Sequence, residues 1–175
     1  MDKQNRLAIT ELCRFSSAKQ WKLQYRATKD GFSAQNFHTK CDGSANTLTV
    51  IKSTNGNIFG GFTEKAWDLT SGYYDDQKAF IFSLVNKENK PFKVMCGIGG
   101  SAIYCNSSDG PRFGNSQGHD IAIVSDSNVN QRSWSTFGSS YKHTDYQFST
   151  DKAKSILAGS YNFKTLEVEV FVRTN

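Results

Sequence analysis

The chain has 175 residues, of which 13% are aromatic, and it contains two prolines. This length suits one domain with a single core, and the composition excludes an intrinsically disordered chain. The formal net charge of +5 comes from residues 1–52, which hold nine Lys or Arg and four Asp or Glu, whereas residues 53–175 hold twelve of each kind. Such an excess can attract an acidic protein surface, anionic lipid or nucleic acid. The basic residues form no run, so we expect a solvated basic edge and no nucleic-acid partner.

Apolar residues and cysteines bear on the cellular compartment. No apolar stretch approaches the roughly 20 residues that span a bilayer, and the polar residues 1–6 lack the apolar core of a secretory signal. We therefore expect a cytoplasmic protein without a transmembrane segment. The cysteines have neither Cys-x-x-Cys spacing nor a zinc-ligand pattern, so reduced, partly buried thiols are expected. They are Cys13, Cys41, Cys96 and Cys105.

The chain begins with a predicted helix and strand. Asp2 can cap a helix that runs to about Phe15. We expect residues 1–18 to form a helical extension and residues 19–175 to form the domain proper. At positions 21–26, Trp, Leu and Tyr alternate with Lys, Gln and Arg, which predicts a strand with one buried face.

A short helix and a hairpin follow. Ser33 can cap a helix that reaches Cys41. Apolar, β-branched runs at residues 48–51 and 58–62 predict two strands, and Asn55-Gly56 between them supplies the positive φ angles of a tight turn. Two glycines inside the second strand, at 60 and 61, indicate a bulge or a close backbone approach.

The middle of the chain predicts further strands joined by glycine. Residues 79–85 are almost entirely apolar, so this strand is expected to be central. Residues 92–96 and 102–104 are expected to pair as a hairpin through the glycine-rich segment 97–101. That segment superficially resembles a phosphate-binding loop, but such a loop precedes a helix, and here a strand is predicted to follow.

The remaining segments are polar apart from two strands. Residues 106–117, 126–140 and 141–155 are expected to be long loops, and residues 121–124 a short buried strand. Many short strands with glycine-rich turns and few helices favour a β-sandwich.

The last segment alternates regularly. Residues 159–165 form a small-residue turn, and Leu166, Val168 and Val170 then fall on one face of a strand. Glu167 and Glu169 fall on the other. We expect the apolar face to be buried and both carboxylates to be in water.

These segments together resemble the TLDc domain family of oxidation-resistance proteins along nearly the whole chain. The matching blocks are WKLQYRA (21–27), DGFS (30–33), FH (37–38), CD (41–42), TLTVIK (47–52), NG (55–56), FGGFT (59–63), AFIFSL (79–84), AIYCNSS (102–108), GHD (118–120), FG (137–138) and GSYNFKTLEVEVF (159–171). The resemblance implies a mainly β fold with short helices, a two-layer antiparallel β-sandwich. The family's connection at residues 97–101 is usually more polar than here.

Two motifs have more than one chemical interpretation. Gly118-His119-Asp120 places an imidazole beside a carboxylate, but neighbouring side chains of an extended chain point apart and no nucleophile motif accompanies them. We therefore favour Asp120 as an acceptor of backbone hydrogen bonds that orders a loop. Asp126, Asn128 and Asn130 alternate as in calcium loops, but the glycine and glutamate of an EF-hand are absent, so a turn is favoured and no metal ligand is assigned.

Aromatic residues in or near loops are candidate interface anchors, although half-buried packing is their commoner role. They are Trp67, Tyr73, Tyr74 and Trp134. The sequence contains no cofactor fingerprint and no complete catalytic set, so we expect neither a cofactor nor a catalytic residue.

The leading hypothesis is a non-enzymatic protein-binding module that is a monomer as an isolated domain. The resemblance implies protection against oxidative stress, regulation of the vacuolar proton-pumping ATPase through its cytosolic sector, or both. The candidate partner-binding residues are Arg26, Asp30, His119, Asp120 and Glu169. Two alternatives stay open: a thiol-based redox protein acting through Cys41, Cys96 or Cys105, and a calcium-dependent or lipid-dependent adaptor, the calcium form using residues 126–130.

Overall fold

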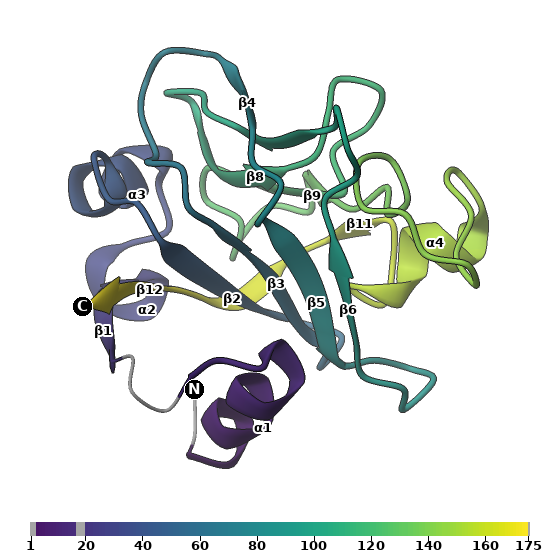
Figure 1. Cartoon of the computed structure of the whole chain (residues 1–175). Coiled ribbons are helices and arrows are strands. Elements are labelled where there is room, and N and C mark those ends of the chain that lie inside the picture. The colour runs from purple at the N-terminus through teal and green to yellow at the C-terminus, as the bar shows by residue number, and fades with distance from the viewer. Residues whose placement is uncertain (1–2, 17–19, 175) are drawn as a thin grey trace.

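In the computed structural model, which describes residues 3–16 and 20–174, two six-stranded sheets pack face to face (Figure 1). All strand pairings within the sheets are antiparallel. The predicted two-layer antiparallel β-sandwich with short helices is therefore confirmed.

Strands from both ends of the chain meet in the first sheet. From one edge to the other, it contains β1 (Gln20–Arg26), β12 (Thr165–Thr174), β2 (Thr47–Ser53), β3 (Ile58–Thr63), β5 (Phe80–Val85) and β6 (Phe92–Met95). The second sheet, also from edge to edge, contains β11 (Asn162–Phe163), β10 (Ser133–Trp134), β9 (Ile121–Val124), β8 (Asp109–Phe113), β7 (Ser101–Tyr104) and β4 (Tyr73–Asp75). The helices are α1 (Lys3–Cys13), α2 (Ala27–Asp30), α3 (Ala34–Cys41) and α4 (Asp151–Ile156).

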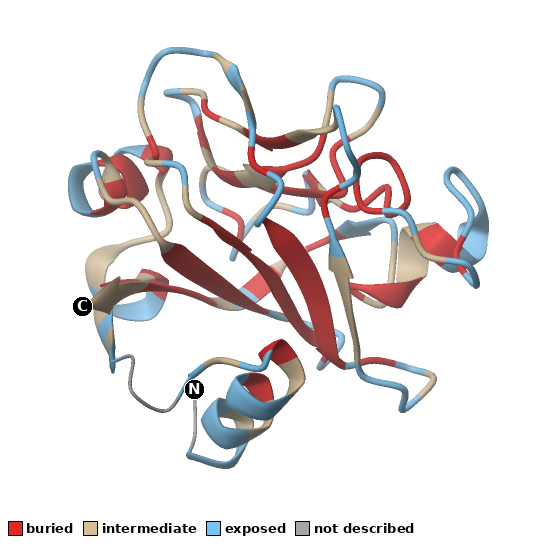
Figure 2. Cartoon of the chain, viewed as in Figure 1, coloured by how far each residue is buried: buried red, intermediate tan, exposed pale blue. Residues whose placement is uncertain are grey.

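The apolar residues form two layers. One lies between the sheets and includes Phe59, Ile103 and Val170, each fully buried. The other lies on the outer face of the first sheet, where α1 packs against it (Figures 1 and 2). Ile9 and Cys13 are the buried residues of this helix. The predicted cap Asp2 lies outside the described residues.

Strand β1 differs from the prediction of one buried face. A register shift between Leu23 and Tyr25 interrupts its pairing with β12. Trp21 and Leu23 consequently pack in the outer layer, whereas Tyr25 lies in the layer between the sheets. The bulge moves the apolar side chains from one face of the sheet to the other.

The short helix and the hairpin form where they were predicted. Ser33 caps α3, because its Oγ accepts a hydrogen bond from the Asn36 backbone N–H at 3.1 Å. In the β2–β3 turn only Gly56 has a positive φ, 87°, while the Asn55 amide donates to the Ala158 carbonyl at 2.9 Å. Gly61 permits a close approach, since a Cβ there would lie 2.6 Å from the Phe113 ring.

The prediction that residues 92–96 pair with residues 102–104 is wrong. β6 pairs with β5 in the first sheet, and β7 pairs with β4 and β8 in the second. The segment 97–101 is a crossover between the sheets rather than a hairpin turn. The Gly97 N–H donates to the Ser140 carbonyl at 3.0 Å, so the chain has left the first sheet by this point.

The predicted long loops contain elements that the sequence pattern did not indicate. β8 lies within residues 106–117, β10 within 126–140, and α4 within 141–155 apart from its last residue, Ile156. β8 contains Gly110 and Pro111, both unusual in strands. β10 spans two residues and α4 spans six, which is too short for a clear periodicity.

The last strand corrects two predictions. Val168 and Val170 are buried as expected, but Leu166 is 49% exposed because a register shift between Thr165 and Glu167 turns it outward. Glu169 does lie on the face opposite to Val168, yet it is 1% exposed and not in water. The reason is the Arg26 side chain, which pairs with it.

Candidate functional site

The candidate partner-binding residues occupy two separate places. Arg26, Asp30 and Glu169 meet where β1, α2 and β12 join. His119 and Asp120 lie immediately before β9 in the second sheet.

Arg26 and Glu169 form a tight ion pair. The Arg26 Nε and Nη2 atoms donate to Glu169 Oε1 at 2.9 and 2.7 Å. Asp30 accepts the Arg26 backbone N–H at 2.9 Å, which holds the pKa of its carboxyl below the usual range. A second interaction with the Lys40 ammonium, at 3.4 Å, acts in the same direction. The group thus fastens α2 to the edge of the first sheet, and its accessible charges are cationic, since the Arg26 side chain is 39% exposed and the Glu169 side chain 2%.

Asp120 orders a loop by accepting backbone hydrogen bonds, which confirms the interpretation favoured for the Gly118-His119-Asp120 motif. Its buried carboxylate accepts the backbone N–H groups of Gly138, Ser139 and Ser140 at 2.8, 3.0 and 2.9 Å. Burial raises the pKa of this carboxyl to about 7, although these N–H donors act in the opposite direction.

His119 makes contacts separate from those of Asp120. Its Nδ1 lies 3.4 Å from the Gly114 carbonyl oxygen, and its Nε2 lies 3.3 Å from Arg112 Nη1. A carbonyl only accepts and a guanidinium only donates, so the ring is neutral with its proton on Nδ1. Burial, together with the Arg112 charge, lowers the pKa of His119 to about 4.

His119 lies beside a row of large side chains on the outer face of the second sheet. Tyr73 pairs with Tyr104, and Tyr104 with Arg112. Arg112 pairs with Ala122, which pairs with Trp134. Directly paired residues of an antiparallel sheet share a face. We call Tyr73, Tyr104, Arg112 and Trp134 the aromatic–arginine row.

Contacts among its own side chains, and one hydrogen bond to Asp109, hold the aromatic–arginine row in place. The Arg112 guanidinium carbon lies 4.9 Å from the Trp134 ring centroid and 5.6 Å from that of Tyr104. Its Nη2 donates to Asp109 at 2.6 Å. The Tyr73 and Tyr104 ring centroids are 4.5 Å apart. Tyr73 is 43% exposed and the other three members are partly exposed, so the row presents a preorganised surface.

The other loop aromatics have structural roles. Trp67 is 1% exposed, and its indole N–H donates to the Thr47 hydroxyl at 3.0 Å. The Tyr74 hydroxyl donates to the Asp68 carboxylate. Sequence reasoning missed Tyr104 and Arg112, because their side chains join Tyr73 and Trp134 only through the strand register.

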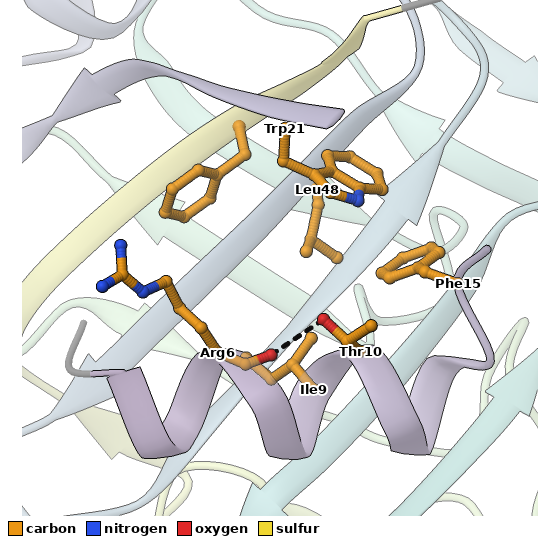
Figure 3. Close-up of a pocket in the computed structure, with 7 residues that line it drawn as sticks. Arg6, Ile9, Thr10, Phe15, Trp21 and Leu48 are labelled. Atoms are coloured by element: carbon orange, nitrogen blue, oxygen red, sulfur yellow. Dashed lines mark hydrogen bonds between the residues drawn. The ribbon is translucent and has the colours of Figure 1, made fainter. Parts of the chain in front are cut away.

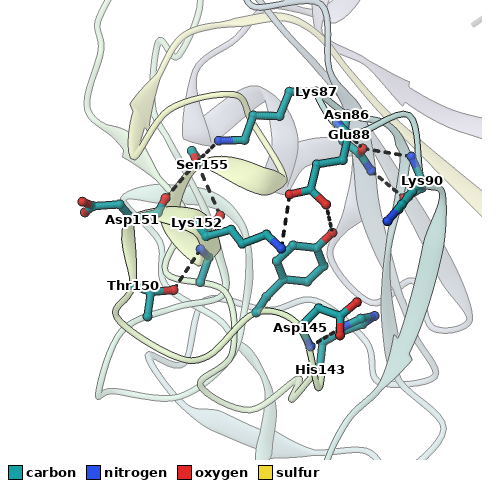
Figure 4. Close-up of polar contacts among 12 residues, drawn as sticks. Asn86, Lys87, Glu88, Lys90, His143, Asp145, Thr150, Asp151, Lys152 and Ser155 are labelled. Carbon is teal, nitrogen blue, oxygen red and sulfur yellow. Dashed lines mark hydrogen bonds and ion pairs between the residues drawn. The ribbon is translucent and has the colours of Figure 1, made fainter.

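A second polar cluster ties the β5–β6 turn to α4 (Figure 4). Glu88 Oε2 accepts the Tyr146 hydroxyl at 2.8 Å, and Lys152 Nζ lies 3.5 Å from Oε1 of the same carboxylate. Burial and the Glu88 carboxylate raise the pKa of Tyr146 to about 12. Asn86 orders the turn by accepting the Glu88 backbone N–H at 3.0 Å. These contacts stabilise the loop before α4.

The cysteines lack the setting of reactive thiols. All four are free cysteines that form no disulfide, and all four are buried. Burial raises the pKa of Cys13 and Cys105 to about 12 and that of Cys96 to about 11, and it also raises the pKa of Cys41. The thiolate, which is the reactive form, is therefore scarce near neutral pH.

The segment 126–130 is a turn closed by its own hydrogen bonds. The Asn130 side-chain amide donates to the carbonyls of Ser125 and Asp126, both at 2.8 Å, and its oxygen accepts the Arg132 backbone N–H. Within residues 3–16 and 20–174, no three His, Cys, Asp or Glu side chains converge as metal ligands.

Comparison with known proteins agrees with the fold. The sequence profile of the TLDc domain matches residues 1–173, so the chain belongs to the TLDc domain family. The MTOR-associated protein MEAK7 of Danio rerio is 28% identical over 64 residues, which are 37% of this chain and 14% of that protein. The match thus spans a small part of that relative's length. Among the helices that the structure describes, none has the length and apolarity to cross a membrane.

Proposed function

We propose that this TLDc domain is a non-catalytic protein-binding module and that the aromatic–arginine row is its contact surface. One observation carries the proposal: Tyr73, Tyr104, Arg112 and Trp134 form one row across neighbouring strands and are partly exposed. Tyr, Trp and Arg are the residue types that most often dominate binding energy at protein interfaces.

The rigidity of the row favours binding. Arg112 is already held between two rings and paired with Asp109, so a partner need not order this long side chain. Binding to preorganised side chains avoids part of the entropy cost of association. Of the five candidate residues, His119 adjoins the row, with its ring centroid 5.4 Å from that of Tyr104. Asp120 supports the loop beneath, and Arg26 is a candidate on a separate surface, where Asp30 and Glu169 hold it.

The finer proposal concerns the partner and its setting. From the family resemblance we propose a cytoplasmic protein that binds the cytosolic sector of the vacuolar proton-pumping ATPase or acts in oxidative-stress protection. Preferential binding to one state of the pump would shift its assembly or activity. The name of the zebrafish relative suggests mTOR association as a second candidate. We keep residues 1–18 as a proposed extension in front of a domain at 19–175.

A comparative pull-down tests the proposal. Wild type, Trp134→Ala and Val85→Ala are immobilised, and proteins captured from cytosolic extract are identified and quantified. Val85 is the matched control, because it is 40% exposed on the first sheet. If Trp134 is a hot spot, Trp134→Ala should lower the affinity for the captured partners about 30-fold, which corresponds to about 2 kcal/mol of binding free energy.

The experiment can refute the contact surface and the identity of the partner separately. Loss of specific partners with Trp134→Ala but not with Val85→Ala supports the row, and pump subunits among those partners support the finer proposal. Capture that is equal for all three proteins would refute the row as the contact surface. Row-dependent partners that exclude pump subunits would refute only the pump assignment.

A further inference from the structure

We infer that a groove between α1 and the first sheet binds a short acidic segment of a partner protein, which inserts one apolar side chain. We call this the α1 groove (Figure 3). It lies on the first sheet, whereas the aromatic–arginine row lies on the second. The inference is therefore independent of the proposed function.

The α1 groove is an apolar cavity with one basic rim residue. α1 leaves about 150 Å³ unfilled over the sheet. Apolar cavities of about this volume bind a benzene-sized group, so there is room for one Leu, Ile or Phe side chain. The lining residues are Arg6, Ile9, Thr10, Phe15, Trp21, Leu48 and Phe171. Five are apolar and none is acidic.

The polar groups of the lining favour an apolar occupant with an anionic neighbour. The Thr10 hydroxyl donates to the Arg6 carbonyl at 2.9 Å, as Figure 3 shows, so an entering side chain leaves no unpaired donor there. Arg6 is exposed, and within the described residues none of the ion pairs involves its guanidinium. It can therefore pair with a carboxylate next to the inserted side chain.

The charge on α1 itself extends this preference, whereas a separate hollow beside Asn5 is lined by Lys52, Glu167 and Glu169. α1 and the residue that follows it carry Lys3, Arg6 and Arg14 against one acid, Glu11. On the far side of the helix, Arg14 and Lys93 line a second hollow with Leu12 and Met95. Cationic groups that flank apolar hollows on both sides complement a segment in which carboxylates flank an apolar residue.

A membrane surface fits these observations less well. Interfacial helices present a broad apolar face to lipid, whereas the apolar side of α1 packs on the sheet and Leu7 is its one large apolar residue that is mainly exposed. The α1 groove is concave and takes a single side chain. We therefore commit to a peptide segment and treat anionic lipid as an outcome of the test.

A displayed library of random 12-residue peptides, selected on the full chain, tests the inference. Enriched peptides should place Asp or Glu within about four residues of Leu, Ile or Phe. When these peptides are titrated into ¹⁵N-labelled protein, the indole signal of Trp21 should shift. The indole signals of Trp67 and Trp134 serve as internal controls and should not move.

Charge variants complete the test. Arg6→Glu should weaken peptide binding at least about tenfold and Arg6→Lys should retain most of it, because the contact is mainly electrostatic. Arg132→Glu is the matched control: Arg132 is also exposed but precedes β10 in the second sheet, so binding should be unchanged. The exposed position of Arg6 predicts folded variants, and their thermal midpoints verify this.

Several outcomes would overturn the inference. These are no enrichment, enriched peptides without acidic residues, unchanged affinity for Arg6→Glu, or a shift of Trp134 in place of Trp21. Arg6-dependent binding to vesicles with about 30% phosphatidylserine, without peptide binding, would assign the surface to anionic lipid instead.

Discussion

His119 and Asp120 are sequence neighbours whose burial shifts their pKa values in opposite directions. The pKa of His119 falls to about 4 and that of Asp120 rises to about 7. Each shift favours the neutral form of the group. Between about pH 4 and 6.5, the contribution of His119 to the free energy of unfolding therefore grows as pH rises. The contribution of Asp120 falls as pH rises from about 4 to 7. These two contributions to the pH dependence of stability oppose each other, so single variants are needed to reveal either one.

We expect His119→Gln to remove a component of stability that rises with pH. The folded-state pKa of about 4 lies below the ordinary value of 6.5, so the unfolded chain binds more protons between these values. The contribution is complete above pH 6.5 and is lost as pH falls toward 4. The unfolding free energy of wild type minus that of the variant should therefore grow by up to about 3 kcal/mol between pH 4 and 7.

Urea unfolding at a series of pH values measures this difference. His143→Gln is the matched control, because His143 is only partly buried and lies in the loop before α4. A His119→Gln difference that is flat from pH 4 to 7 would contradict the burial argument.

At the scale of elements, β-bulges decide which side chains the sheets bury. The bulges in β1 and β12 place Tyr25 between the sheets and turn Leu166 outward. Alternation along a sequence does not reveal a bulge, because the extra residue is defined by the pairing of two strands far apart in the chain.

We expect Val168→Ala to lower the free energy of unfolding by about 1–3 kcal/mol, because its side chain is 2% exposed between the sheets. Leu166→Ala in the same strand is the matched control and should change it by no more than about 0.5 kcal/mol, since Leu166 is 49% exposed. Denaturant titration measures both. Equal costs for the two variants would show that the bulge is misplaced.

Strong local signals in the sequence were sufficient for much of the fold. Ser33 predicted the α3 cap and Gly56 the β2–β3 turn, since both features depend on neighbouring residues only. The β6–β7 pairing was predicted wrongly, because adjacent strands can belong to different sheets. Asp120 was correctly expected to accept backbone hydrogen bonds. The aromatic–arginine row could not be predicted from the sequence, because it depends on the register of strands in the second sheet.

At the scale of the whole molecule, the first sheet is covered on both faces and the second on one. The inner face of the first sheet packs against the second sheet, and the outer face of the first sheet packs against α1 (Figure 1). The outer face of the second sheet instead carries Tyr73, Tyr104, Arg112 and Trp134, all at least partly exposed. This asymmetry leaves the aromatic–arginine row open on the second sheet, where we propose the recognition face, whereas the apolar outer face of the first sheet is partly covered by α1.

Burial of all four thiols predicts their behaviour in the intact protein. Dithiothreitol should leave the thermal midpoint unchanged, because the cysteines form no disulfide. A thiol reagent such as 5,5′-dithiobis(2-nitrobenzoate) should react slowly in native buffer and with four equivalents in denaturant. Rapid native labelling of Cys41, Cys96 or Cys105 would restore the redox alternative, and a drop of several degrees under reductant would reveal a disulfide.

Amide hydrogen exchange of the chain bound to a captured partner tests the central claim most directly. Binding through the aromatic–arginine row should slow exchange in β4, β7, β8 and β10, and Trp134→Ala should abolish this protection while leaving the free protein folded. Exchange in β5 and β6 of the first sheet should be unaffected. Protection confined to the first sheet, with none in β7, β8 or β10, would contradict the assignment of the second sheet as the recognition face.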